Sequence, residues 1–340
     1  MTATPAIQLG DVSWTYRGVE TPALHGLDMT IDRGETVVLA GASGSGKSTI
    51  LRLMNGLIPH LHEGRLTGDV RLLGASTTAL DLAGFGRKTG SVWQHPFRQF
   101  FASTVTDEIA FALENHGDVP ERIRHRVDEL LTSHDLVQVR NRLLSTLSSG
   151  QQQLVALLAA IAHRPQLLLL DEPSANLSES ATARLVASLA RLRGEGVTTV
   201  IAEHRISPFL PITDRIVSVS GGRLETTWRP QAFTRLSEHE RSSHGLRPRT
   251  LPPQRAVPGV ASGRSIEASG PQTSAHRADT PALRNAREGV TLENILCVKD
   301  GHVILDLDHA HFPPGRVTVL RGGNGAGKTT LARIIVGLQR

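Results

Sequence analysis

The chain has 340 residues, of which 39% are apolar, and its formal net charge at pH 7 is +5. This length predicts about two domains. The longest apolar run, residues 154–162, is too short to cross a membrane, and the single Cys297 excludes an intrachain disulfide. The pI near 10.1 does not by itself indicate nucleic-acid binding, because the net charge is small and the arginines are spread along the chain, so we expect no nucleic-acid partner.

Residues 1–227 have the pattern of one α/β domain, in which short strand-like runs alternate with helix-like segments. The run at 167–170 is uniformly apolar, as expected for a strand that is buried on both faces. The expected strands are residues 7–9, 36–40, 70–72, 91–93, 167–170, 198–202 and 216–219, and the expected helices are 121–131, 151–163 and 178–193.

A glycine-rich loop, GASGSGKST at residues 41–49, separates the strand-like run 36–40 from a helix-like segment. This is the P-loop pattern of P-loop NTPases: glycines let the backbone approach phosphate oxygens, and the following helix directs its amides at the anion. The pattern predicts that Lys47 neutralises phosphate charge and that Ser48 ligates Mg²⁺. We expect ATP to be bound by Gly41, Ser43, Gly44, Gly46, Lys47, Ser48 and Thr49.

Two acidic residues follow the apolar run 167–170. In P-loop hydrolases an acid at the end of such a strand holds Mg²⁺ together with the P-loop hydroxyl, which predicts that role for Asp171. Glu172 is then placed to act as the general base on the attacking water. The alternative, an acidic region that caps a helix, explains the pair less well because the P-loop lies upstream.

Composition changes after residue 227. Residues 228–287 are rich in Pro, Ser and Arg without periodicity, and they bury too little apolar surface to offset the entropy of ordering. We interpret this segment as a disordered linker. The alternative is a tail that folds on a partner.

The P-loop pattern recurs as GGNGAGKTT at residues 322–330, after a strand-like run at 317–320 and before a helix-like segment. Residues 34–57 and 315–338 align without gaps, so residues 288–340 are predicted to be the amino-terminal fragment of a second, truncated copy. The second copy lacks an acidic strand. Its expected nucleotide-binding residues are Gly322, Gly325, Gly327, Lys328, Thr329 and Thr330.

The sequence Leu-Ser-Ser-Gly-Gln at residues 147–151 resembles the signature motif of the ATP-binding-cassette (ABC) ATPases. Gln94, His204 and Tyr16 resemble that family's Q-loop glutamine, switch histidine and adenine-stacking aromatic, and the motifs over residues 5–225 follow the family order. The resemblance implies a mixed sheet with an antiparallel β subdomain and a helical subdomain. It assigns catalytic roles to Gln94, His204 and Glu172, Mg²⁺ to Ser48, Gln94 and Asp171, and nucleotide contacts to Ser148, Ser149, Gly150 and Gln151.

Residues 94–115 are similar to the ATPases of energy-coupling factor importers, which take up vitamins or transition-metal ions. The similarity implies a membrane scaffold subunit that docks near Phe97, Phe100 and Phe101, a substrate-binding membrane subunit reached indirectly, and a location on the cytoplasmic face of the cell membrane. The alternative for the three phenylalanines is local core packing.

In ABC ATPases each ATP lies between the P-loop of one cassette and the signature of another, so the resemblance implies a second ATPase domain or chain. Two other readings remain open. As alternatives to the importer subunit, the chain is a soluble tandem ATPase acting on ribosomes or nucleic acid, or a non-catalytic fragment of a longer tandem ATPase. Ser149 stands where the family has glycine, and it keeps a small side chain and a hydrogen-bond donor, which is compatible with function. The departure at Ser178, where the family has Asp, bears on communication across the dimer.

Overall fold

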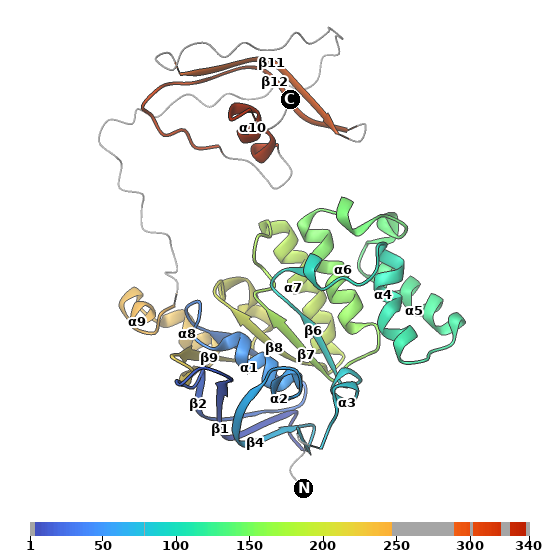
Figure 1. Cartoon of the computed structure of the whole chain (residues 1–340), viewed down its shortest axis with the longest axis vertical. Coiled ribbons are helices and arrows are strands. Elements are labelled where there is room, and N and C mark those ends of the chain that lie inside the picture. The colour runs from blue at the N-terminus through green and yellow to red at the C-terminus, as the bar shows by residue number, and fades with distance from the viewer. Residues whose placement is uncertain (1–3, 78, 247–288, 300–301, 321–326, 338–340) are drawn as a thin grey trace. The chain divides into compact units, whose positions relative to one another are not determined.

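The computed structural model describes residues 4–77, 79–246, 289–299, 302–320 and 327–337. The chain divides into two compact units, Met1–Pro253 and Gln254–Arg340, whose elements are labelled in Figure 1. Among the described residues, no helix combines the length and the apolar character needed to cross a bilayer.

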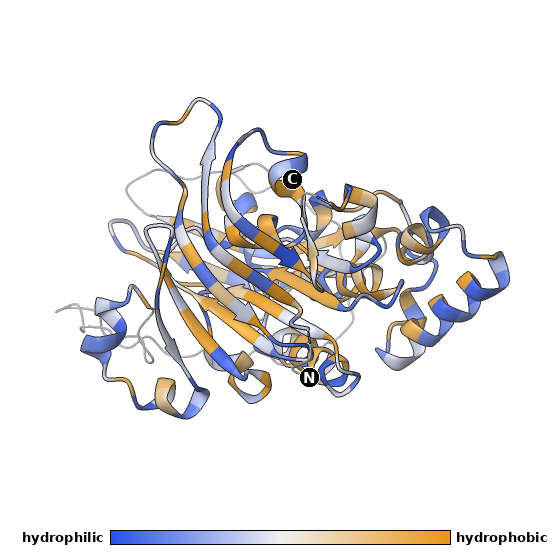
Figure 2. Ribbon diagram, turned by 90° about the horizontal axis from the view of Figure 1, so that it is seen from below, coloured by the Kyte–Doolittle hydropathy of each residue, from blue (hydrophilic) through white to orange (hydrophobic). Residues whose placement is uncertain are grey.

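A six-stranded sheet forms the centre of the first unit. Its order is β10 (Arg223–Trp228), β9 (Arg215–Ser220), β3 (Thr36–Ala40), β8 (Thr198–Glu203), β7 (Leu167–Asp171) and β6 (Thr89–Val92). All pairs are parallel except β10 with β9. The predicted α/β fold is confirmed, and so is the inference from the 167–170 run, because every residue of β7 is buried. Figure 2 shows apolar residues concentrated along these strands.

An antiparallel sheet covers one face of the central sheet, together with the helix that follows the P-loop. It consists of β2 (Leu24–Ile31), β1 (Ile7–Tyr16), β4 (Gly64–Leu72) and β5 (Ala75–Ser76), in that order. The core on this side joins Trp14, Leu39 and Ile50. The helices α1 (Lys47–Met54), α2 (Leu57–His60) and α3 (Leu82–Gly86) complete this side.

Four longer helices cover the opposite face (Figure 1). They are α4 (Val105–Asn115), α5 (Pro120–Ser133), α6 (Ser149–Ile161) and α7 (Glu179–Gly194). Val38, Leu168 and Ile201 point to this face, while their strand neighbours point to the other, as the two-residue period of a strand requires. Short 3-10 turns lie at Pro96–Arg98, Val137–Val139, Leu144–Thr146 and Ser207–Ile212.

The prediction of a disordered linker from residue 228 is wrong for its first part. Residues in that range form α8 (Pro230–Arg235) and α9 (Glu238–Ser243). The Trp228 and Phe233 rings lie 5.8 Å apart, and the buried Arg241 guanidinium stacks 4.6 Å from the centre of the Phe233 ring. These large side chains bury enough surface to order the two helices, which the average composition of residues 228–287 does not indicate. The rest of the predicted linker, 247–287, lies outside the described residues.

The second unit contains an antiparallel hairpin, β11 (Val290–Lys299) and β12 (His302–Phe312), and α10 (Lys328–Ile335). The strand-like run 317–320 forms no strand here, and Val317 is 93% exposed. Its counterpart β3 is a strand between β8 and β9, and no such neighbours occur in the described part of the second unit. Gly322 and Gly325 lie outside the described residues, whereas Gly327 caps α10 with a left-handed φ of 76°.

Candidate functional site

The first P-loop connects the end of β3 to the start of α1, with Gly46 in a left-handed conformation just before the helix. A Cβ on Gly41 would lie 2.2 Å from the Val219 carbonyl oxygen, so only glycine fits at the start of the loop. The Lys47 ammonium is buried and donates to the carbonyls of Gly41 and Ala42 at 2.9 and 2.8 Å. Burial lowers the pKa of Lys47, against the opposing charges of nearby acids.

Asp171 is the last residue of β7, and its carboxyl is buried and hydrogen-bonded to the Ser48 hydroxyl. Burial raises the pKa of Asp171, while the bond from Ser48 opposes the shift. A buried carboxylate beside a hydroxyl supplies the hard oxygen ligands that Mg²⁺ prefers. The residues present therefore fit a Mg²⁺ ion.

Glu172 is held from both sides by residues that follow the two strands flanking β7. Gln94, after β6, donates its amide to Glu172 Oε2 at 2.9 Å. His204, after β8, places Nε2 at 2.6 Å from Glu172 Oε1. Because the carboxyl ends of parallel strands meet at one edge of the sheet, three residues far apart in the sequence become one cluster beside the P-loop.

Tyr16 ends β1 and lies over the start of α1. Its hydroxyl is 3.4 Å from the Thr49 hydroxyl and accepts a hydrogen bond from Arg52 at 3.3 Å. The His62 ring meets the Tyr16 ring edge-on, with centroids 6.0 Å apart. The phenol ring is thus anchored next to the P-loop helix.

The signature residues lie at the start of α6, on the other face of the sheet from α1. Ser148 and Gln151 form a reciprocal capping box, as an ordinary helix start would. A Cβ on Gly150 would lie 2.8 Å from the Ala181 Cβ, so the glycine permits close packing of α6 on α7. Among the described residues, no hydrogen bond or ion pair joins this segment to the P-loop.

Three further residues near these segments are absent from the sequence-based set. They are Arg52, which contacts Tyr16, Glu108, which accepts hydrogen bonds from the Phe101 and Ala102 amides, and Glu203, which ends β8. Glu203 follows an apolar strand-like run just as Asp171 does, so the same signal would have found it.

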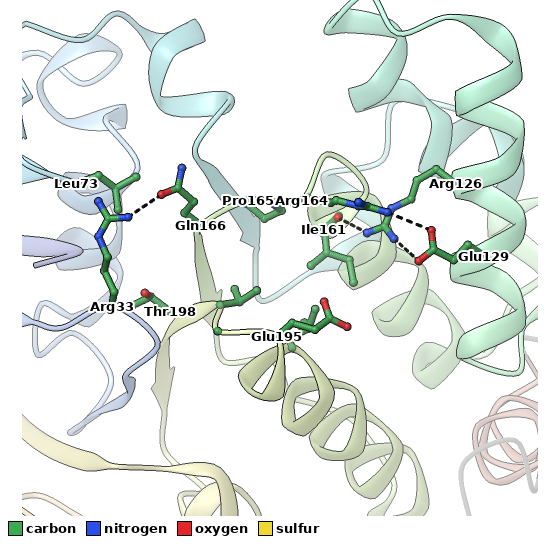
Figure 3. A pocket seen from close by; sticks show the side chains of 13 residues that line it. Arg33, Leu73, Arg126, Glu129, Ile161, Arg164, Pro165, Gln166, Glu195 and Thr198 are labelled. Carbon is green, nitrogen blue, oxygen red and sulfur yellow. Dashed lines mark hydrogen bonds and ion pairs between the residues drawn. The ribbon is translucent and has the colours of Figure 1, made fainter. Parts of the chain in front are cut away.

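A separate hollow of about 530 Å³ lies at the amino ends of β7 and β8. In Figure 3 the Arg33 side chain points to Gln166 and Arg126 points to Glu129. Ligands of open α/β sheets bind at the carboxyl ends of the strands. The P-loop edge, rather than this hollow, is therefore the candidate active site.

The sequence matches the family described as ABC transporter over residues 24–175 and 305–340. The chain belongs to the ABC transporter family. An ABC transporter ATP-binding protein from Treponema denticola, named as putative, is 32% identical over 334 residues, covering 98% of this chain and 65% of the relative. A protein of the same name from Streptomyces avermitilis is 33% identical over 367 residues, covering 98% and 64%. This ABC chain thus spans less than two thirds of the length of these curated relatives.

Solved ABC structures share the fold of the first unit. The structure of cbiO1 from Clostridium perfringens, part of the ABC transporter complex cbiONQ, has a TM-score of 0.61 and 27% identity, covering 68% of this chain and 92% of that one. The dimeric bacterial ABC transporter cassette MJ0796 has a TM-score of 0.59 and 28% identity, covering 66% and 98%. The same cassette has been solved in a post-hydrolysis state with ADP and Pi. The first unit is therefore an ABC ATPase domain.

Proposed function

We propose that the first unit binds ATP with Mg²⁺ at its P-loop and hydrolyses it with Glu172 as general base. The observation that carries this proposal is the position of Glu172, which is fixed by Gln94 and His204 at the sheet edge where Lys47 and Asp171 also lie. Glu172 takes a proton from water as the water oxygen bonds to the γ-phosphorus, and the bond from that phosphorus to the β,γ-bridging oxygen breaks to leave ADP and phosphate.

The other side chains have separate tasks in this scheme. Lys47 neutralises the charge of the terminal phosphates, and the ring of Tyr16 stacks on adenine. Ser48, Asp171 and Gln94 would hold Mg²⁺, which supplies charge neutralisation at the phosphate oxygens when bound. His204 keeps the Glu172 carboxylate aimed through the 2.6 Å contact.

We propose further that turnover requires a facing cassette. The signature at residues 148–151 lies on the opposite face of the sheet from the P-loop helix, so it is placed to serve a nucleotide bound elsewhere. The dimeric state of the related cassette MJ0796 supports this arrangement. The facing cassette is a second copy of this chain or another ATPase subunit.

Light scattering on the purified full chain tests the requirement. Glu172→Gln with ATP and Mg²⁺ is expected to increase in mass, because binding closes the pair and blocked turnover keeps it closed. The Glu172→Gln, Lys47→Ala double variant is the matched control and should not change. A wild-type protein that stays strictly monomeric during full hydrolysis would contradict the requirement.

We propose that this ATPase energises a membrane importer of the energy-coupling factor type, with a vitamin or a transition-metal ion as cargo. Phe97 is 56% and Phe101 is 77% exposed, and the Phe101 ring stacks on Phe111 at 4.8 Å. Phe100 instead packs against the core of the helical side. The exposed rings of Phe97 and Phe101 offer an apolar anchor to a membrane scaffold subunit. The similarity to cbiO1, part of the transporter complex cbiONQ, supports this interpretation.

Membrane fractionation of native cells tests the importer proposal. The full chain is expected to sediment with the membranes, and Phe101→Ser is expected to release it to the soluble fraction. Val19→Ser is a matched control, since Val19 is also exposed but lies outside the aromatic segment. Sedimentation with ribosomes instead would favour the soluble tandem ATPase.

A further inference from the structure

Glu203 is a buried acid that the proposed mechanism leaves without a role. It is the last residue of β8, only 2% exposed, and it directly precedes His204. Its Oε1 accepts the backbone amides of His204 and Arg205 at 2.8 and 3.0 Å. Its Oε2 accepts the Ser174 amide and hydroxyl at 3.2 and 2.8 Å. Four donors converge on one carboxylate, which fills its accepting capacity.

These four bonds join the turn after β8 to the turn after β7. The β7 turn is strained, because Glu172 and Asn176 are non-glycine residues with φ values of 46° and 62°. Ser174 lies midway between them and is the residue that Glu203 holds. A strained turn persists only where surrounding contacts fix it. The Glu203 carboxylate is such a contact.

The same carboxylate therefore holds the main chain on both sides of the Glu172–His204 contact. It fixes the backbone of His204 directly, and it fixes the backbone two residues beyond Glu172 through Ser174. We infer that Glu203 is a positioning residue that sets the 2.6 Å contact between Glu172 and His204 and so keeps Glu172 aimed for proton transfer. The inference rests on the proposed ATPase function for its effect on rate.

Glu203→Gln tests the inference with little change in volume. The amide replaces one accepting oxygen by an NH₂ group, so two of the four donors lose their acceptor. In the full chain the kcat for ATP is expected to fall roughly 10- to 100-fold, as when a residue that orients a metal ligand is removed. The KM for ATP should stay close to the wild-type value. Glu225→Gln, on the exposed surface of β10, is the matched control.

A double-mutant cycle separates positioning from general structural support. In a His204→Ala background there is no contact left to set, so Glu203→Gln should lower kcat no further. A loss of equal size in both backgrounds would overturn the inference. Should Glu203→Gln fail to fold, Ser174→Ala removes only the hydroxyl bond and should show a smaller loss that also vanishes in the His204→Ala background.

Chemical labelling gives a readout that does not need hydrolysis. His204 is 12% exposed in its contact with Glu172, so diethyl pyrocarbonate should modify it slowly, as followed by mass spectrometry. Glu203→Gln is expected to raise that rate, while the rate at the exposed His125 stays constant. An unchanged His204 rate would overturn the inference. If wild type hydrolyses no ATP even together with its facing cassette, the proposed function fails, and the labelling alone decides the role of Glu203.

Discussion

Glu172 Oε1 and His204 Nε2 lie 2.6 Å apart although the two residues follow different strands, β7 and β8. The contact exists because β7 and β8 pair in parallel with Asp171 opposite Ala202, which brings their carboxyl ends to one edge. Gln94 completes the arrangement from β6. The candidate general base is thus held by side chains from both neighbouring strands.

Glu172→Gln should reduce the ATPase rate by about 10²–10⁴-fold, because an amide cannot take the proton from water. Binding of a fluorescent ATP analogue should persist, since Lys47 and Asp171 are unchanged. Lys47→Ala should instead weaken binding of the ATP analogue, because it removes the ammonium that is proposed to neutralise phosphate charge. Steady-state rates and titrations of both variants check this, and unchanged rates in both would contradict the site.

Asp171→Asn should uncouple ATP binding from Mg²⁺. ATP with Mg²⁺ at 100 times its Kd should stabilise the folded wild type by about 2.7 kcal/mol. EDTA, which removes Mg²⁺, should abolish most of that stabilisation. The variant keeps the size of the side chain but loses the negative charge, which makes Asp171 the strongest of the expected Mg²⁺ ligands. Thermal melts with ATP plus Mg²⁺ or EDTA should then coincide for Asp171→Asn. A magnesium-dependent shift as large as that of wild type would exclude Asp171 as a ligand.

Glu108 offers a pH-dependent prediction away from the ATP site. It is buried, and one oxygen, Oε2, accepts the amides of Phe101 and Ala102. Burial raises the pKa of Glu108, so the folded state favours its protonated form, and ionisation costs stability as pH rises through the acid range. Glu108→Gln keeps an oxygen that accepts both amides and should become more stable relative to wild type as pH rises from 4 to 7, by denaturant unfolding.

Glu108→Ala is the contrasting variant, because it leaves both amides without an acceptor. We expect it to lower the free energy of unfolding by about 1–3 kcal/mol. Equal stabilities of the Ala and Gln variants at pH 7 would show that the two hydrogen bonds contribute nothing.

Gly41→Ala should lower the free energy of unfolding by about 1–3 kcal/mol through the clash of the new Cβ with the backbone carbonyl of Val219 at 2.2 Å, in addition to the strain of its positive φ. Gly117→Ala is the matched control, since Gly117 has a left-handed φ of 77° but open space around it. The control should cost only the strain of that conformation, about 1–2 kcal/mol. Urea unfolding of both variants checks the difference, and equal losses would contradict the steric argument.

The sequence was sufficient for the parts of the fold that rest on local pattern. The uniform apolar run became β7, and the 36–40 run became β3 with the same bounds. The helix α4 was not predicted, although Thr104 caps it and Val105, Ile109 and Leu113 form its buried face. The run at 317–320 was predicted as a strand from its β-branched residues, but a strand also needs neighbours, and these are not visible in local sequence.

The site was less predictable than the fold. Motif order singled out Gln94, Glu172 and His204, but their mutual contacts follow from strand order, which spacing alone does not give. Local structure alone accounts for the signature residues: Ser148 and Gln151 form a capping box, and Gly150 permits close helix packing. Their contacts with nucleotide remain a prediction, because we propose that these contacts form only with a facing cassette.

The small helices after β10, α8 and α9, belong to the first cassette and change where a version of it expressed alone should end. Phe233 and Leu246 are buried in the same core as the large helices, and a Cβ on Gly245 would lie 3.8 Å from that of Ala42 in the P-loop. A cassette that is expressed only to residue 227 would lack α8 and α9, and the apolar residues on which they pack would be exposed to water. A cassette that ends just after Leu246 keeps α8 and α9 and is the better choice for producing the first cassette by itself.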